Sequence, residues 1–177
     1  MRAFFVIAAA VLVGFVISPR LRADAAACTP TPAATAVAAA PGSWSDEQVA
    51  NARVIVTIGT ERGVPDEAKV IAVATALQES RLRNLRGGDR DSIGLFQQRP
   101  SQGWGTPKQL SDPAYQTGKF YDKLLTVAGW RKMRLTEAAQ AVQVSAFPEA
   151  YAKHQPAATR LVGMFGVPGA ASCTTGA

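Results

Sequence analysis

Apolar residues along the chain follow two different patterns. Residues 3–18 are an almost unbroken apolar run behind Arg2, whereas apolar positions after residue 44 recur at the spacing of one face of an α-helix. The segment between them is rich in alanine, proline and threonine and cannot contribute a packed core. We predict a signal peptide at 1–27, a linker at 28–43, one helical domain at 44–166 and a tail at 167–177.

The predicted signal peptide leaves two alternatives open. Small residues around Ala25 fit a cleavage site, and the apolar run is shorter than the roughly 20 residues of a membrane span. Arg20 and Arg22 are unusual for a cleavage region, so residues 3–18 could instead remain as a membrane tether. In both cases we expect the domain outside the cytoplasm, either secreted or facing outward at the cell envelope.

Start and stop signals divide the domain into four main helices followed by two short ones. Ser45 to Gln48 forms a capping box, and Asp112 precedes a first-turn proline at the third helix. The predicted helices cover residues 46–62, 65–80, 113–128 and 136–147, with the short ones between Pro148 and Gly166. The glycine-rich segment 84–107 predicts a loop and a short β-hairpin.

The second predicted helix is apolar on nearly all sides, which is typical of a buried central helix. One face carries only small residues and then Glu79 in the last turn, which leaves room for a ligand. Burial and the negative end of the helix dipole both disfavour an ionised carboxylate there. An acid that cleaves glycosidic bonds must keep its proton near neutral pH, so this setting suits a general acid. The alternative is an exposed ion pair between Glu79 and Arg81, Arg83 or Arg86.

The sequences IAVATALQES at 71–80 and SIGLFQ at 92–97 resemble two motifs of the soluble lytic transglycosylases and goose-type lysozymes. The resemblance to this lysozyme-like superfamily covers residues 48–165, and LFQQRPSQGWGT at 95–106 is similar to exported actinobacterial members. It implies a mainly α fold of the α+β lysozyme-like type, with a short β-hairpin beside the active-site groove. It also implies that Glu79 is the catalytic acid and base. Phe96 stands where the family usually has methionine.

The same resemblance implies a set of substrate-binding residues. In the family's third motif, Ala-Tyr-Asn-Ala-Gly, Ser145 takes the place of the asparagine and Phe147 that of the glycine. Tyr151 is the candidate for a tyrosine that lies near the acid in the family. A tryptophan in the glycine-rich loop can stack on a sugar ring. The implied residues are Ser80, Ser92, Gly94, Gln97, Gln98, Trp104, Ser145 and Tyr151.

By this resemblance, the reaction is cleavage of the β-1,4 bond between N-acetylmuramic acid and N-acetylglucosamine in peptidoglycan. Glu79 would act as base either on the muramoyl 6-hydroxyl, as in a lytic transglycosylase, or on water, as in a lysozyme. Hydrolysis by inversion would need a second carboxylate about 6.5–9.5 Å away. Asp89 and Asp91 are the candidates for this second acid, although aspartates between glycines are also common turn formers. The family's other acidic position corresponds to Arg99. Transglycosylase and lysozyme therefore both stay open.

Charge, cysteines and missing motifs limit the binding partners and cofactors that we expect. The net charge of +6 suits an anionic cell wall but also favours solubility. Cys28 and Cys173 are expected to form a disulfide outside the cytoplasm. His154 is the only histidine, and the chain has no phosphate-binding loop or aromatic platform for nucleic acids. We expect no cofactor, no metal and no nucleic-acid partner, and a monomer that binds peptidoglycan glycan strands.

Two functions from different classes follow. The first is an enzyme that cleaves peptidoglycan with Glu79. The second is a catalytically weak or inactive relative that binds cell-wall glycan or an envelope partner, which the altered third motif favours.

Overall fold

The computed structural model describes residues 44–145 and 147–165 and is mainly helical, as predicted. The predicted signal peptide, linker, tail and cysteine pair lie outside these residues. The longer helices are α1 (Asp46–Glu61), α2 (Asp66–Ser80), α4 (Pro113–Thr126), α5 (Leu135–Gln143) and α6 (Gln155–Phe165). Between them lie α3 (Pro107–Leu110) and the 3₁₀ turns η1 (Pro100–Gln102), η2 (Trp130–Lys132) and η3 (Ala152–His154). None of the described helices is long and apolar enough to cross a membrane.

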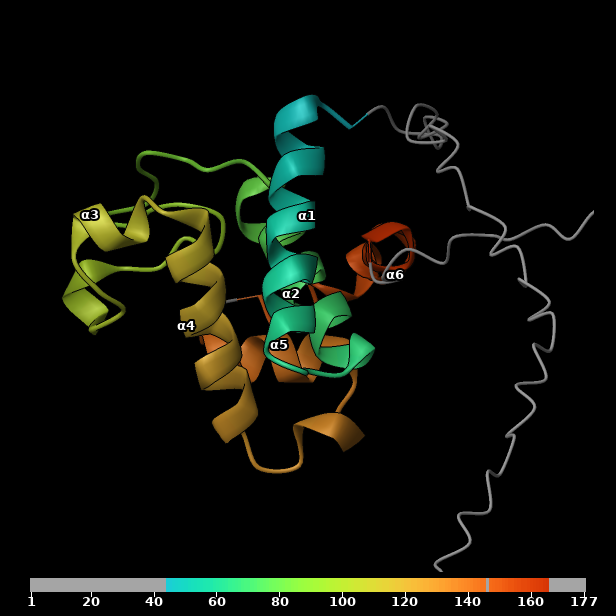
Figure 1. The fold of residues 1–177 in the computed structure, drawn as a ribbon. Coiled ribbons are helices and arrows are strands. Elements are labelled where there is room, and N and C mark those ends of the chain that lie inside the picture. The colour runs from blue at the N-terminus through green and yellow to red at the C-terminus, as the bar shows by residue number, and fades with distance from the viewer. Residues whose placement is uncertain (1–43, 146, 166–177) are drawn as a thin grey trace, which may run out of the picture.

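Helix α2 is the centre of the domain. It contacts α1, α4, α5, α6 and η3 (Figure 1). Residues 71–77 of α2 are all buried, which confirms the prediction of a buried central helix. Each fully buried Val, Leu or Ile stabilises the fold by about 1.5–3 kcal/mol, so α2 fixes the positions of the helices around it.

The start signals of the helices are confirmed. The Ser45 hydroxyl accepts a hydrogen bond from the backbone N–H of Gln48 at 3.3 Å, and the Gln48 side chain accepts one from the backbone N–H of Ser45 at 2.8 Å. Asp112 caps α4 by accepting from the backbone N–H of Ala114 at 2.8 Å. These side chains satisfy N–H groups that have no partner within the helix.

Two elements differ from the prediction. Helix α5 ends at Gln143 instead of continuing to residue 147, because Val144 adopts a left-handed conformation with φ of 52°. A β-branched residue in this region is unusual, and nothing in its local sequence indicates a helix end there. Helix α3 was not predicted, although Thr106 and Gln109 form a capping box around Pro107.

The predicted β-hairpin is not confirmed. Ile93 and Gln98 form a single antiparallel bridge, with N–H···O distances of 2.9 and 3.1 Å, around the turn at 94–97. Gly94 has φ of 81°, and a Cβ atom there would lie 2.1 Å from the side-chain amide of Gln116. Both the conformation and the space at this position therefore require glycine.

Candidate active site

Glu79 lies in the last turn of α2 and is half-buried. Its Oε1 accepts a hydrogen bond from the Tyr151 hydroxyl at 2.9 Å, across 72 residues of sequence. Within residues 44–145 and 147–165, no arginine forms an ion pair with Glu79, so the alternative pairing with Arg81, Arg83 or Arg86 is not observed. The carboxylate is thus held by a neutral donor.

The chain turns sharply directly after Glu79. Arg81 and Leu82 both adopt left-handed conformations, with φ of 55° and 59°, which is unusual for residues other than glycine. Two amides from α1 bind this turn: the side chain of Gln48 donates to the Arg81 carbonyl, and that of Asn51 to the Leu82 carbonyl, each at 2.8 Å. Helix α1 therefore fixes the end of α2 and the direction in which Glu79 points.

Ser80 joins α2 to the turn at 94–97. The Ser80 hydroxyl is buried and lies 2.8 Å from the Leu95 carbonyl and 3.0 Å from the Ala76 carbonyl. It is engaged with backbone atoms in the core instead of facing an open groove. Ser80 thus holds the end of α2 against the turn at 94–97, beside Glu79.

The other predicted binding residues of this segment divide into buried and accessible ones. Ser92, Gly94 and Gln98 are buried, and the Ser92 hydroxyl forms no hydrogen bond to Glu79 in the described part of the chain. The Gln98 side chain donates to the Gln116 carbonyl at 3.3 Å and supports the turn from below. Gln97 stays half-buried, with its amide nitrogen 3.0 Å from the Gly94 carbonyl. Of these four residues, Gln97 is the one placed to reach a ligand.

Tyr151 is the predicted tyrosine that the structure brings to the acid. Burial raises the pKa of its hydroxyl above the ordinary value, and the nearby Glu79 adds to this effect. The Ser145 hydroxyl also contacts Tyr151 and acts in the opposite direction on the pKa. Tyr151 therefore keeps its proton at neutral pH and remains a hydrogen-bond donor to Glu79.

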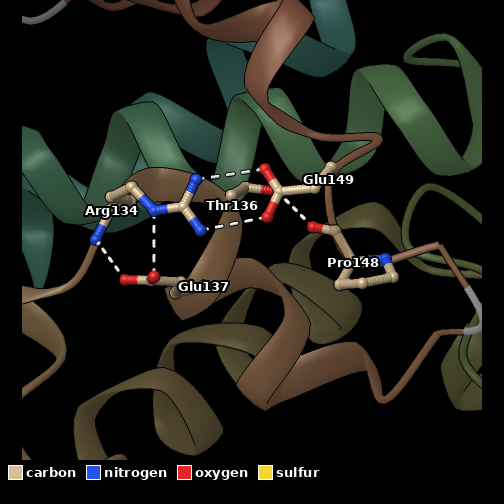
Figure 2. A network of polar contacts seen from close by, with 5 residues as sticks. All are labelled: Arg134, Thr136, Glu137, Pro148 and Glu149. Atoms are coloured by element: carbon tan, nitrogen blue, oxygen red, sulfur yellow. Dashed lines mark hydrogen bonds and ion pairs between the residues drawn. The ribbon is translucent and has the colours of Figure 1, made fainter.

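A polar network holds the segment that carries Tyr151 (Figure 2). Glu149 accepts two hydrogen bonds from the Arg134 guanidinium, at 3.0 and 3.1 Å, and Glu137 accepts a third at 2.9 Å. The buried Thr136 hydroxyl donates to the Pro148 carbonyl. The start of α5 is thus tied to residues 148–149, which precede Tyr151 in the chain.

Replacing Tyr151 with phenylalanine is expected to slow any reaction that depends on Glu79 by about 10- to 100-fold, because a hydrogen bond to a charged group is lost. Tyr121→Phe is a matched control, because it removes another buried hydroxyl, bonded to the Ile55 carbonyl at 3.0 Å. An unchanged rate for Tyr151→Phe would contradict the assigned role.

The two candidate second acids are not positioned alike. Asp91 is 2.6 Å from the Arg99 guanidinium and accepts from the Ser101 backbone N–H at 2.8 Å. The Ser101 hydrogen bonds and the Arg99 charge hold the pKa of Asp91 well below its usual range. Its carboxylate is therefore a weak base with its oxygens already engaged. The Asp89 side chain is 92% exposed, and its carboxylate lies 3.9 Å from the Arg90 guanidinium.

Asp91→Asn is expected to lower the stability of the domain at neutral pH. A carboxylate whose pKa is depressed by folding stabilises the folded state above its unfolded pKa of about 3.9, and this contribution is lost as the pH falls. The difference in melting temperature between wild type and variant should therefore shrink below about pH 4.

Asp89→Asn should change any cleavage rate by no more than about twofold. A large rate loss for Asp89→Asn would instead identify it as the second acid.

A pocket of about 570 Å³ lies between α4, the end of α5 and the loop after η1. Trp104, predicted to contact sugar, lines this pocket, whereas Glu79 is not among its lining residues. Gln143 lines it too, and its side chain donates to the Phe96 carbonyl at 2.8 Å. Gln143 was not among the predicted binding residues. The sequence feature that could have indicated it is its position in the altered third motif.

His154 is a second neighbour that sequence reasoning did not place. Its Nε2 lies 3.0 Å from the Gln78 side-chain oxygen, so η3 is joined to the last turn of α2 beside Glu79. Burial, with a smaller effect of Lys153, lowers the pKa of this imidazole. His154 thus serves as a neutral contact at this end of the helix.

No family model matches the chain, and no curated protein matches it.

Proposed function

We propose that the protein cleaves the β-1,4 bond between N-acetylmuramic acid and N-acetylglucosamine in peptidoglycan, as a lytic transglycosylase with Glu79 as its acid and base. The proposal includes a lysozyme-like fold for residues 44–166 and an exported, monomeric protein. The observation that carries it is the Glu79–Tyr151 hydrogen bond at the end of the buried helix. This contact keeps a donor at the carboxylate where negative charge develops when Glu79 gives up its proton.

In the first step, Glu79 protonates the glycosidic oxygen as the bond to the anomeric carbon breaks. The acetamido oxygen of the muramoyl unit attacks that carbon from the other side, so the substrate supplies its own nucleophile. Glu79 becomes negatively charged in this step. The Tyr151 hydroxyl donates to the developing charge, and a donor that binds more strongly in the transition state lowers the barrier.

In the second step, the Glu79 carboxylate removes the proton of the muramoyl 6-hydroxyl. The hydroxyl oxygen then attacks the anomeric carbon, the bond to the acetamido oxygen breaks, and a 1,6-anhydromuramoyl end forms. Glu79 regains its proton, and no water is consumed. Inversion with water would need a free second carboxylate, but Asp91, the half-buried candidate, is bound by Arg99 and Ser101. This arrangement favours the transglycosylase over the lysozyme.

A second candidate function is binding of cell-wall glycan without cleavage. The pocket between α4 and α5 favours it, because Glu79 does not line that pocket, and Val144, which does, is 80% exposed. Incubation with dye-labelled, insoluble peptidoglycan separates the two functions. The enzyme releases soluble dye and Glu79→Gln does not, whereas a binding protein sediments with the polymer and releases none. Absence of both release and co-sedimentation would exclude both functions.

A further inference from the structure

The pocket between α4 and α5 carries positive charge that the structure leaves unpaired. Lys119 and Lys123 line it from successive turns of α4, and neither forms an ion pair in residues 44–145 and 147–165. Asp122 also lines the pocket, but its carboxylate is engaged with Arg62. The pocket therefore favours an anionic ligand.

The opposite wall offers an aromatic surface and amide groups. Trp104 is half-buried, and its carbonyl accepts a hydrogen bond from the Tyr115 hydroxyl at 3.3 Å, which fixes this part of the loop. Gln102 and Gln143 line the pocket beside it. An aromatic face with amide donors and acceptors suits a ligand that has both apolar and peptide-like groups.

The pocket is connected to Glu79 through the end of α5. Gln143 lines the pocket and binds the Phe96 carbonyl in the turn at 94–97. Ser145, two residues further on, contacts Tyr151, which in turn binds Glu79. The end of α5 therefore borders both the pocket and the Tyr151–Glu79 pair.

We propose that this pocket binds the peptide stem of peptidoglycan through its carboxylates, with Lys119 and Lys123 as the charged contacts and Trp104 as the apolar one. The inference rests on the proposed function, because it takes peptidoglycan as the polymer at Glu79. The sugar backbone itself is neutral, since the muramoyl carboxyl group is consumed in the bond to the peptide. The stem is the part of the polymer whose charge complements the two lysines.

Calorimetric titration with a soluble N-acetylmuramoyl tripeptide tests the inference. This probe has no glycosidic bond to cleave, so its binding is independent of catalysis. Wild type and Glu79→Gln should bind it equally, whereas Lys119→Gln combined with Lys123→Gln should weaken binding about tenfold, an effect that added salt reduces. Lys108→Gln with Lys132→Gln is the matched control, because it removes two exposed charges outside the pocket.

Three outcomes would overturn the inference: no binding of the tripeptide, equal binding by the Lys119/Lys123 variant, or equal binding of the same tripeptide with its carboxylates converted to amides. Tighter binding of a phosphodiester-linked wall polymer than of the tripeptide would be a fourth such outcome. Cleavage of peptidoglycan without tripeptide binding would leave the proposed function intact and reject this inference alone. Tripeptide binding without any cleavage would reject the proposed function and leave binding of the peptide stem in place.

Discussion

Replacing Glu79 with glutamine is expected to lower the rate of peptidoglycan cleavage by about 10²- to 10⁴-fold, the usual contribution of a general acid or base. Glutamine has nearly the same shape and can still accept the hydrogen bond from Tyr151, but it has no proton to give to the glycosidic oxygen. The rate is measured as release of dye from labelled peptidoglycan. Helical circular dichroism should stay unchanged, because the substitution leaves the core of α2 intact.

Glu67→Gln provides the matched control for this experiment. Glu67 lies in the first turn of the same helix, is exposed and is far along α2 from Glu79. Its replacement should leave the cleavage rate within about twofold of wild type. Equal rates for Glu79→Gln and Glu67→Gln would show that the carboxylate at position 79 is not catalytic.

Replacing Phe96 with alanine is expected to reduce the free energy of unfolding by about 3–5 kcal/mol, the cost of truncating a buried aromatic side chain. Phe96 is fully buried, and its ring stacks on that of Phe120 with a centroid distance of 4.7 Å and an interplanar angle of 16°. Since domains of this size have a total stability of about 5–15 kcal/mol, the loss is a large share of it. Urea unfolding followed by circular dichroism measures the change.

Phe96→Met is the informative comparison, because methionine is the residue that the resembling family usually has at this position. Methionine fills much of the same volume with a flexible side chain, so its expected cost is below about 1.5 kcal/mol. This variant should also keep the Phe96 carbonyl in place for Gln143. If Phe96→Met and Phe96→Ala lost equal stability, filling the volume would not be enough, and the aromatic stacking on Phe120 would itself be what supports the turn at 94–97.

The helical elements could be predicted from the sequence because their signals are local. A capping box at Ser45 and a proline after Asp112 act within one turn, and the structure confirms them. The apolar composition of α2 likewise indicated a central helix. The end of α5 could not be predicted, since it depends on a left-handed Val144 that no glycine or proline announces.

The candidate site was predictable only in part, because side chains that meet there come from distant segments. The pattern placed Glu79 at the end of a buried helix and suggested Tyr151 by resemblance, and the structure brings the two together. The sequence pattern did not indicate that the Ser80 hydroxyl donates a hydrogen bond to the Leu95 carbonyl. It also did not indicate that Arg99 forms an ion pair with Asp91. Such pairings depend on how loops return to the helix ends, and binary patterning does not encode this.

The most direct test of the central claim is the mass of the fragments that the mature protein releases from purified peptidoglycan. The single-carboxylate mechanism predicts disaccharide peptides with 1,6-anhydromuramoyl ends, lighter by one water than the hydrolytic products, and none above background with Glu79→Gln. Fragments with reducing ends would contradict the transglycosylase mechanism. Equal release by wild type and Glu79→Gln, or no release by either, would contradict the assignment of Glu79 as the catalytic acid.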